Sequence, residues 1–272
     1  MEWLLLVLLG LIAAVFGSIV GLGGGIIIVP ALLLVSPALI GQQLDHATAA
    51  GISLTVLIVT ALASTLSYKK RGIVDLRSGL LLFASSGPAA VAGAALTGKL
   101  NAGSFNLAFG FFMLFMAVLL IVRDRMKPFT KEWPIKRTIT DSSGQLHSYS
   151  YGKLPMLAIG ACVGLISGLF GIGGGSLFVP VMVLLFRFPP HVAAATSMFV
   201  IFLSSIVGSG MHAALSEVNW LLVLALAPGA WLGGVIGAAI AVRMSGKGLM
   251  WLLRATLLAL AAKMIYDGFA AL

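Results

Sequence analysis

The most constraining feature of this sequence is a glycine-rich segment of ten residues that occurs twice. The first copy, GLGGGIIIVP, runs from Gly21 to Pro30, and the second, GIGGGSLFVP, runs from Gly171 to Pro180. A segment repeated at a fixed offset indicates an internal duplication. Each copy interrupts an apolar run, and every glycine costs about 1 kcal/mol relative to alanine in a helix interior. We therefore expect a helix break at each copy, called here the first glycine turn (Gly21–Gly25) and the second glycine turn (Gly171–Gly175).

The composition excludes an ordinary soluble domain. The chain of 272 residues is 60% hydrophobic and 9% charged, with a mean hydropathy of +1.11, which is typical of a multi-pass, all-α membrane protein. The net charge of +9 does not indicate nucleic-acid binding, because most cations lie between apolar stretches, where they act as topology signals facing anionic lipid. The single cysteine, Cys162, excludes a disulfide and a cysteine metal cluster.

The apolar stretches have the same order in both halves of the chain. Each half has one long stretch, a glycine turn, a short stretch and three further long stretches, located at 3–20, 26–36, 46–67, 76–98 and 104–122, and again at 154–170, 176–186, 192–215, 219–242 and 248–269. Weaker matches also pair HATAAGIS from His46 with HVAAATSM from His191, and Tyr68 with His212. We therefore divide the chain into a first repeat (1–122), a basic linker (123–153) and a second repeat (154–272).

The positions of the cations predict how the repeats are oriented. If each glycine turn joins a long and a short helix into a helical hairpin, the second repeat is inverted relative to the first, and fourteen loop cations face the cytoplasm against Lys99 alone outside. If each turn is only a kink within one crossing, the repeats are parallel, and the distribution is eleven against four. The positive-inside rule favours the inverted arrangement, with a cytoplasmic linker and both termini outside.

The glycine turns are the candidate binding site. Eleven helical residues rise about 16 Å, roughly half the hydrocarbon thickness, so each hairpin should end near the midplane. Discontinuous helices that meet there in inverted repeats form the substrate site of many secondary transporters. Exposed N–H groups and two helix N-termini suit a small anion. The predicted substrate-binding residues are the turn glycines and nearby serines, namely Gly21, Gly23, Gly24, Gly25, Gly171, Gly173, Gly174, Gly175, Ser176, Ser18 and Ser167.

The other polar residues agree with an anion site. Asp45, Asp75, Glu217 and Asp267 all fall near the ends of apolar stretches, so no carboxylate is predicted at the midplane, where a cation-binding acid is expected. His212, near the end of its stretch, is a candidate for proton coupling. Pro30 and Pro180 are expected to end or kink the short helices. His46 and His191, each at the start of a stretch, are expected to anchor or cap their helices.

Other functional classes are less well supported by the sequence. It contains none of the HExxH, GxxxxGK[ST] or intramembrane GxGD motifs, and we expect no metal and no cofactor. Ser209 and His212 could form an intramembrane serine–histidine pair, but no third orienting group is evident. An anion channel remains an alternative, because the same pocket would serve it. The sequence leaves the oligomeric state open.

The paired GxGGGxxxVP segments, the basic central loop and the elements Val74-Asp75-Leu76 and Val218-Asn219-Trp220 together resemble the TauE/SafE family of sulfite and organosulfonate exporters. The resemblance covers essentially the whole chain. It implies a bacterial-type inner-membrane transporter that moves small sulfur oxyanions, organosulfonates or related anions, generally outward. Two positions depart from the family pattern: Tyr68, where relatives often have histidine, and Asn219, where aspartate is common.

Overall fold

We analysed a computed structural model of the chain. The structure describes residues 2–41, 43–123, 133–140, 144, 146–243 and 247–271. Ten helices and one two-stranded sheet follow in the order α1 (Glu2–Val20), α2 (Gly25–Ile40), α3 (His46–Lys69), α4 (Leu76–Thr97), α5 (Ala102–Arg123), β1 (Ile135–Thr140), β2 (Leu146–Tyr151), α6 (Lys153–Phe170), α7 (Gly175–Phe186), α8 (Pro190–Ala214), α9 (Trp220–Ala241) and α10 (Lys247–Ala270). The linker cations Arg125, Lys127 and Lys131 lie outside the described residues.

Both predicted helix breaks are confirmed, because α1 and α6 end just before the glycine turns and α2 and α7 begin at their last glycine. Pro30 and Pro180 were expected to end or kink the short helices, and the first of these alternatives is wrong. α2 continues through Pro30 and Pro37 to Ile40, and α7 continues through Pro180 to Phe186. Membrane helices tolerate proline where neighbouring groups satisfy the freed carbonyl. The first short helix is therefore 16 residues long, longer than the predicted stretch of 26–36.

Seven of the described helices are long and apolar enough to cross a membrane, namely α1, α3, α4, α5, α6, α8 and α9. This confirms an all-α, multi-pass membrane protein. The sequence predicted eight long stretches, and the eighth is α10, which has 24 residues but is not among these seven. It carries charged residues along its length, among them Lys263 and Asp267, whose side chains pair at 3.0 Å.

Long helices of one half of the chain pack against long helices of the other half. α1 packs on α9, and the equivalent helices of the opposite repeats, α6 and α4, pack in the same way. Glycines make both contacts close, because a Cβ on Gly233 of α9 would lie 2.5 Å from the Leu11 carbonyl oxygen and one on Gly160 of α6 would lie 2.8 Å from that of Leu82. Close approach through small residues is how membrane helices gain packing energy. Each repeat thus relies on the other for two of its long-helix interfaces.

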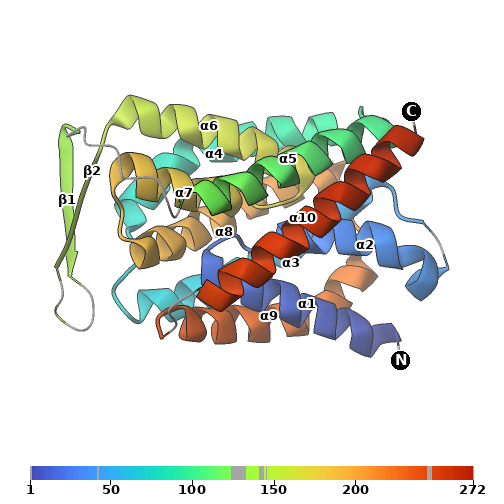
Figure 1. Ribbon diagram of the computed structural model, residues 1–272, viewed down its shortest axis with the longest axis horizontal. Helices are drawn as coiled ribbons and strands as arrows, with labels where there is room; N and C mark the ends of the chain where they lie inside the picture. The colour runs from blue at the N-terminus through green and yellow to red at the C-terminus, as the bar shows by residue number, and fades with distance from the viewer. Residues whose placement is uncertain are drawn as a thin grey trace.

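Equivalent helices that touch run antiparallel. Thr55 of α3 bonds to Ser209 of α8, while Gly51, one turn earlier in α3, approaches the later residue His212. α5 and α10 are arranged likewise, since Gly103 of α5 approaches the last turn of α10 and Gly110 approaches Ala261 and Ile265. Figure 1 shows both termini at one end of the bundle and the β1–β2 hairpin at the other.

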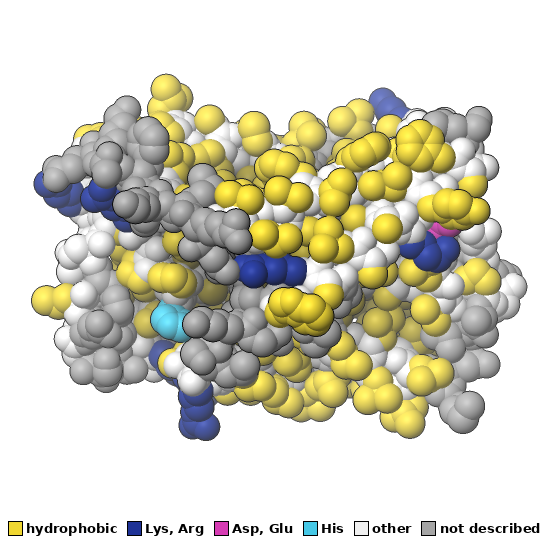
Figure 2. Space-filling model, viewed as in Figure 1, with side chains coloured by type: hydrophobic (Ala, Val, Ile, Leu, Met, Phe, Trp, Pro, Cys, Tyr) yellow, Lys and Arg dark blue, Asp and Glu magenta, His cyan; other side chains and the backbone are white. Residues whose placement is uncertain are grey.

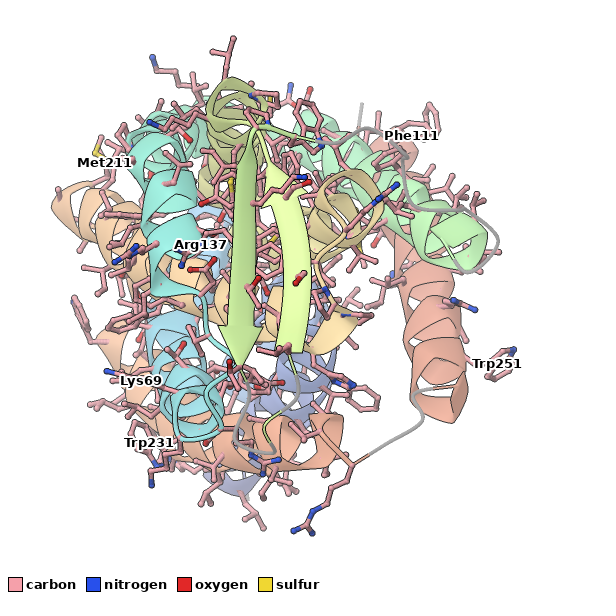
Figure 3. All side chains as sticks on the ribbon, turned by 90° about the vertical axis from the view of Figure 1, so that its left-hand side faces the viewer. Lys69, Phe111, Arg137, Met211, Trp231 and Trp251 are labelled. Carbon is pink, nitrogen blue, oxygen red and sulfur yellow. The ribbon has the colours of Figure 1, made fainter. Side chains whose placement is uncertain are left out.

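The linker forms a β-hairpin, which the sequence did not predict. β1 and β2 pair antiparallel, with Ile135 opposite Tyr151 and Thr140 opposite Leu146. Figure 3 shows the hairpin standing across the end of the helix bundle, with Arg137 on it. Trp133, just before β1, donates its indole N–H to the Leu185 carbonyl of α7 at 3.1 Å. The hairpin is therefore docked on the second short helix.

The surface fits a lipid environment. Hydrophobic side chains cover the long helices in the middle of the face seen in Figure 2. Leu224, Trp231 and Phe115 are among the large apolar side chains that are more than 40% exposed. In a soluble protein such an extensive apolar surface would mark an interface, whereas in a multi-pass membrane protein it faces acyl chains.

Candidate functional site

Each glycine turn reverses the chain within a few residues. Gly21, Gly23 and Gly24 have φ values of 76°, 83° and 99°, and Gly171, Gly173 and Gly174 have 69°, 74° and 72°. This left-handed region is readily available only to glycine. Both turns therefore have the same backbone path, in agreement with the duplication.

Some of the backbone N–H groups at the turns already form hydrogen bonds within the protein. The N–H groups of Leu22 and Gly23 donate to the Gly17 carbonyl at 2.7 and 3.1 Å. In the second turn, the N–H groups of Gly171 and Ile172 donate to the Ser167 carbonyl at 2.9 and 3.3 Å. These bonds cap α1 and α6, so fewer amides face outward than the sequence predicted. In the first turns of α2 and α7, the amides of Ile27, Ile28, Leu177 and Phe178 donate to the Gly24 and Gly174 carbonyls. Among the described contacts, the first-turn amides left for a ligand are those of Gly25, Ile26, Gly175 and Ser176.

The two glycine turns touch each other in the centre of the bundle. A Cβ on Gly25 would lie 2.6 Å from the Gly171 carbonyl oxygen, and a Cβ on Gly175 would clash with the Gly21 carbonyl oxygen. Residues about 150 positions apart in the sequence are thus brought together, as a site between two opposed hairpins requires. All eight predicted turn glycines are buried.

Two serines tie each turn to the opposite repeat. Ser53 of α3 donates to the Gly171 carbonyl at 2.6 Å, and Ser197 of α8 donates to the Gly21 carbonyl at 2.7 Å. Neither serine was among the predicted site residues, because most hydroxyls of the apolar stretches were expected to bond their own backbone or a neighbouring helix. The signal that could have found them is the spacing Ala-x-x-Ser, which Ala50–Ser53 and Ala194–Ser197 share.

Leu57 and Ile201 close the space beside the turns. A Cβ on Gly23 would lie 2.8 Å from a methyl group of Leu57 and 3.3 Å from one of Ile201, and a Cβ on Gly173 would meet the same two side chains at 2.8 and 2.9 Å. Both side chains are fully buried. The middle glycine of each turn therefore faces an apolar wall contributed by α3 and α8.

The three predicted serines have different surroundings. Ser18 bonds to Ser64 of α3 at 2.7 Å, so its hydroxyl serves helix packing. Ser167 is buried, and its carbonyl caps α6. Ser176, in the first turn of α7, is 1% exposed, and its hydroxyl has no hydrogen-bond partner within the described ranges. An unpaired buried hydroxyl is costly, and of the three serines only Ser176 offers such a group beside the contacting turns.

Near the end of the helix before each glycine turn, a backbone carbonyl contacts a side chain at the end of α3 or α8. Tyr68 at the end of α3 donates to the Ser18 carbonyl at 2.7 Å. The Ser18 carbonyl also accepts the Gly21 amide at 3.3 Å. His212 at the end of α8 lies with Nε2 3.4 Å from the Gly168 carbonyl oxygen. The predicted equivalence of Tyr68 and His212 is consistent with these matching contacts.

The imagined Ser209–His212 pair is not formed. Ser209 bonds to Thr55 at 2.6 Å, and His212 Nδ1 lies 2.7 Å from a carboxylate oxygen of Glu217, which the sequence analysis had not connected with it. Glu217 belongs to the loop after α8, next to Ser216 with its positive φ of 60°. That irregular turn brings the carboxylate back to the helix, and no periodic pattern predicts it. Within the described ranges, no group of three or more His, Cys, Asp or Glu side chains could hold a metal ion.

Two cavities lie at opposite ends of the bundle. A cavity of about 270 Å³ is lined by Asp45, His46, Thr97 and Glu217 together with Ala47, Gly98 and Leu100. A second, of about 290 Å³, lies at the β-hairpin and is lined by Lys136, Arg137 and Arg187 with hydroxyl side chains. Neither is lined by a glycine of the two turns.

Asp75 caps α4 and ties the β-hairpin to the bundle. Its carboxylate accepts hydrogen bonds from the Arg77 and Ser78 amides, the Ser78 hydroxyl and the Tyr149 hydroxyl, and pairs with Arg137 at 3.1 Å. Burial opposes ionisation of Asp75, but these bonds and the Arg137 charge outweigh it and hold the pKa of the carboxyl below its usual value. Burial, followed by the bond to Asp75, raises the pKa of the Tyr149 phenol.

Comparison with known proteins places the chain in a family. The family model described as "Sulfite exporter TauE/SafE" matches residues 6–264. The chain is 47% identical over 270 residues, 98% of its length and 99% of the relative's, to the probable membrane transporter protein YunE of Bacillus subtilis. It is 27% identical over 240 residues, 88% of its length and 84% of the relative's, to a probable membrane transporter protein of Xylella fastidiosa.

A second Bacillus subtilis protein, the probable membrane transporter protein YjnA, is 23% identical over 274 residues, 96% of this chain and 98% of the relative. No solved structure matches the chain. The family match spans both glycine turns and all the helices that contact them. The chain belongs to the TauE/SafE family of membrane transporters and is a multi-pass protein of the plasma membrane.

Proposed function

We propose that this protein is a secondary transporter that carries a small anion, such as sulfite or an organosulfonate, out of the cell, with the anion bound between the two glycine turns. The family description supports the substrate class and the outward direction. Two repeats, 1–122 and 154–272, move relative to each other about this site, and the basic linker 123–153 lies on the cytoplasmic side.

The observation that carries the proposal is the contact between the glycine turns. The N-termini of α2 and α7 lie at this contact, where Gly25 approaches the Gly171 carbonyl oxygen. Two helix N-termini directed at one place make a positive, donor-rich site that suits an anion. The buried, unpaired hydroxyl of Ser176 adds a donor beside it.

The arrangement also favours a carrier over a channel. The turns are in contact, and Leu57 and Ile201 cover their middle glycines, so separation of the turns is needed before an anion can pass. The antiparallel course of α3 against α8 and of α5 against α10 supports inverted repeats, which permit one site to open alternately to each side.

Flux measurements in proteoliposomes test the proposal. Sulfite, sulfoacetate, taurine, sulfate and a set of carboxylates are compared for uptake and for counterflow against the same anion inside. We expect saturable flux and counterflow for a sulfur oxyanion or sulfonate, with protein-free liposomes as the control. Ohmic current without counterflow would identify a channel, and the absence of flux for every anion would overturn the substrate class.

A topology measurement tests the inverted orientation. A reporter fused after the C-terminus should lie outside the cell, and a second, inserted at Gly144 in the exposed turn of the β-hairpin, should lie inside. If both reporters lie on the same side, the inverted arrangement is wrong.

A further inference from the structure

His212, which is buried, forms a pair with the partly exposed Glu217. His212 is 0% exposed at the end of α8, and its ring lies between two oxygen atoms. Nδ1 is 2.7 Å from Glu217 Oε2, and Nε2 is 3.4 Å from the Gly168 carbonyl oxygen. That carbonyl is available because the amides of Gly171 and Ile172 both turn back to Ser167 instead. One imidazole therefore links a carboxylate to the helix that leads into the second glycine turn.

This arrangement needs one proton more than a neutral imidazole and an ionised carboxylate possess. A backbone carbonyl can only accept, so Nε2 must carry a hydrogen to bond Gly168. The short separation between Nδ1 and the Glu217 oxygen also requires a hydrogen between them. A neutral imidazole has a single N–H, and the second hydrogen therefore resides either on Nδ1, as imidazolium beside carboxylate, or on the Glu217 carboxyl.

Loss of this proton changes the bond to the second turn. The remaining hydrogen is held best on Nδ1, because a hydrogen bond to an ionised carboxylate is about twice as strong as one to a neutral acceptor. Nε2 then presents a lone pair to the Gly168 carbonyl oxygen, and two acceptors repel. The protonated pair thus holds the end of α6, and the deprotonated pair releases it.

A route for the proton leads from solvent to the pair. Glu217 lines the cavity of about 270 Å³ at the end of the bundle that carries both termini (Figure 1), and its side chain is 18% exposed. The titratable groups facing this cavity from α3 and its cap are His46 and Asp45. α4 contributes the Thr97 side chain and the Gly98 backbone, with Lys99 next in the chain.

We propose that His212 and Glu217 form a proton-binding site, loaded through this cavity, whose occupancy sets the hydrogen bond to the Gly168 carbonyl and so couples a proton to the movement of the second glycine turn. The coupling to transport rests on the proposed function. The proton-binding site itself does not, because it follows from the contacts of the pair.

Nitrogen NMR of the purified, histidine-labelled protein tests the site without any substrate. The His212 signal is assigned by its loss in His212→Gln. Between about pH 5 and pH 8, the range in which histidine titrates, it should change to the form protonated only at Nδ1. The starting form is the doubly protonated ring if Nδ1 holds the second hydrogen, and the ring protonated only at Nε2 if the Glu217 carboxyl holds it. In Glu217→Gln, which is close to isosteric, the midpoint of this change should move, because the partner charge is lost.

Two results would overturn the site. One is a His212 ring that keeps a single protonation state and tautomer across this range, and the other is a midpoint that Glu217→Gln leaves unchanged. The control is His191→Gln, which removes an exposed histidine at the other end of α8 and should leave the His212 titration as it is.

A pH-sensitive dye trapped in the proteoliposomes then tests the coupling. With sulfite and sulfoacetate as probe anions, proton movement per anion carried should fall at least about tenfold in Glu217→Gln and remain normal in His191→Gln. Titration of His212 without flux of any anion would retain the site and reject the transport proposal. Proton movement that Glu217→Gln does not alter would retain transport and reject the coupling.

Discussion

The two glycine turns are alike where they face each other and different where they join the helices before them. On the facing side, Ser53 and Ser197 make matching bonds to the carbonyls of Gly171 and Gly21. On the other side, the first turn is held by a tyrosine hydroxyl, which donates at every physiological pH, and the second by a histidine, which donates from Nε2 only in some protonation states. The two turns are thus packed alike at the centre, whereas the ionisable groups beside them differ.

The largest expected effect tests whether the two glycine turns are equivalent where they contact each other. Gly25→Ala and Gly175→Ala each place a Cβ against a backbone carbonyl of the opposite turn. Overpacking of about 1–3 kcal/mol at a rigid contact should lower anion flux at least about tenfold in both variants. Gly210→Ala is the matched control, because its Cβ meets nothing within 4 Å. A loss in only one variant would show that the turns are not equivalent in function.

Removing the cross-repeat bonds should have a smaller effect. Ser53→Ala and Ser197→Ala each leave a buried carbonyl without its hydroxyl donor, a loss of about 1–3 kcal/mol that should appear as a lower melting temperature and reduced flux. The losses of unfolding free energy in the two variants should agree within about 0.5 kcal/mol if the two bonds are equivalent in energy as well as in geometry. Ser67→Ala, whose hydroxyl bonds only within its own helix, should change little. A large difference between the two serine variants would contradict this equivalence.

The tyrosine of the first repeat should be structural only. Tyr68→Phe removes the bond to the Ser18 carbonyl and should cost about 1 kcal/mol, lowering flux by the same factor from about pH 5 to pH 8. Tyr266→Phe, at a side chain that is 74% exposed, is the control. A change in the shape of the pH profile of Tyr68→Phe would mean that the first turn also senses protons.

The smallest expected effect compares the two caps at the equivalent ends of α4 and α9. Asp75 and Asn219 both cap through their side-chain oxygens, but only Asp75 also binds Arg137 and Tyr149. The pKa of Asp75 is held below its usual value of 3.8. Its stabilising effect is therefore fully present above pH 3.8 and is lost as the pH falls through the lower, folded-state value.

Asp75→Asn keeps the cap and removes the charge, so it should lower the free energy of unfolding by about 1 kcal/mol near neutral pH and flatten the loss of stability in acid. Thermal unfolding followed from pH 7 downward measures both effects. Asn219→Asp is the reciprocal change and has no arginine partner to gain within the described contacts. An acid response that Asp75→Asn leaves unchanged would assign that response to another group.

Most of the fold could be predicted from the sequence because the membrane imposes a simple rule. Apolar stretches become helices, and four glycines in five residues interrupt them, so the helix order and most helix bounds agree with expectation. The end of the first short helix was predicted too early, because Pro30 and Pro37 are tolerated inside a buried helix. The β-hairpin was missed although Ile135, Arg137 and Ile139 alternate with Lys136 and Thr138, a period of two that the polarity of the linker concealed.

The glycine turns and their contact were predicted, and their part in binding a substrate stays a prediction. The glycine turns were identified because glycine is the residue that reverses a chain most readily, and the structure brings them together. The partners of the turns depend on how α3 and α8 cross, and the sequence analysis did not distinguish Ser53 and Ser197 from the other hydroxyls of these helices. Glu217 reaches His212 through a turn with positive φ at Ser216, and no helical or strand spacing predicts that contact.

The packing of long helices of one half of the chain against those of the other half has a consequence for biosynthesis. α6 is made after its partner α4, so it can pack as soon as it enters the bilayer, whereas α1 ends at Val20 and its partner α9 begins at Trp220. At a translation rate of about 5–20 residues per second, synthesis of α9 begins roughly 10–40 s after α1 is complete. Two interfaces that are equivalent in the finished protein are therefore completed at different stages of translation, and the N-terminal helix depends on nearly the whole chain being synthesised.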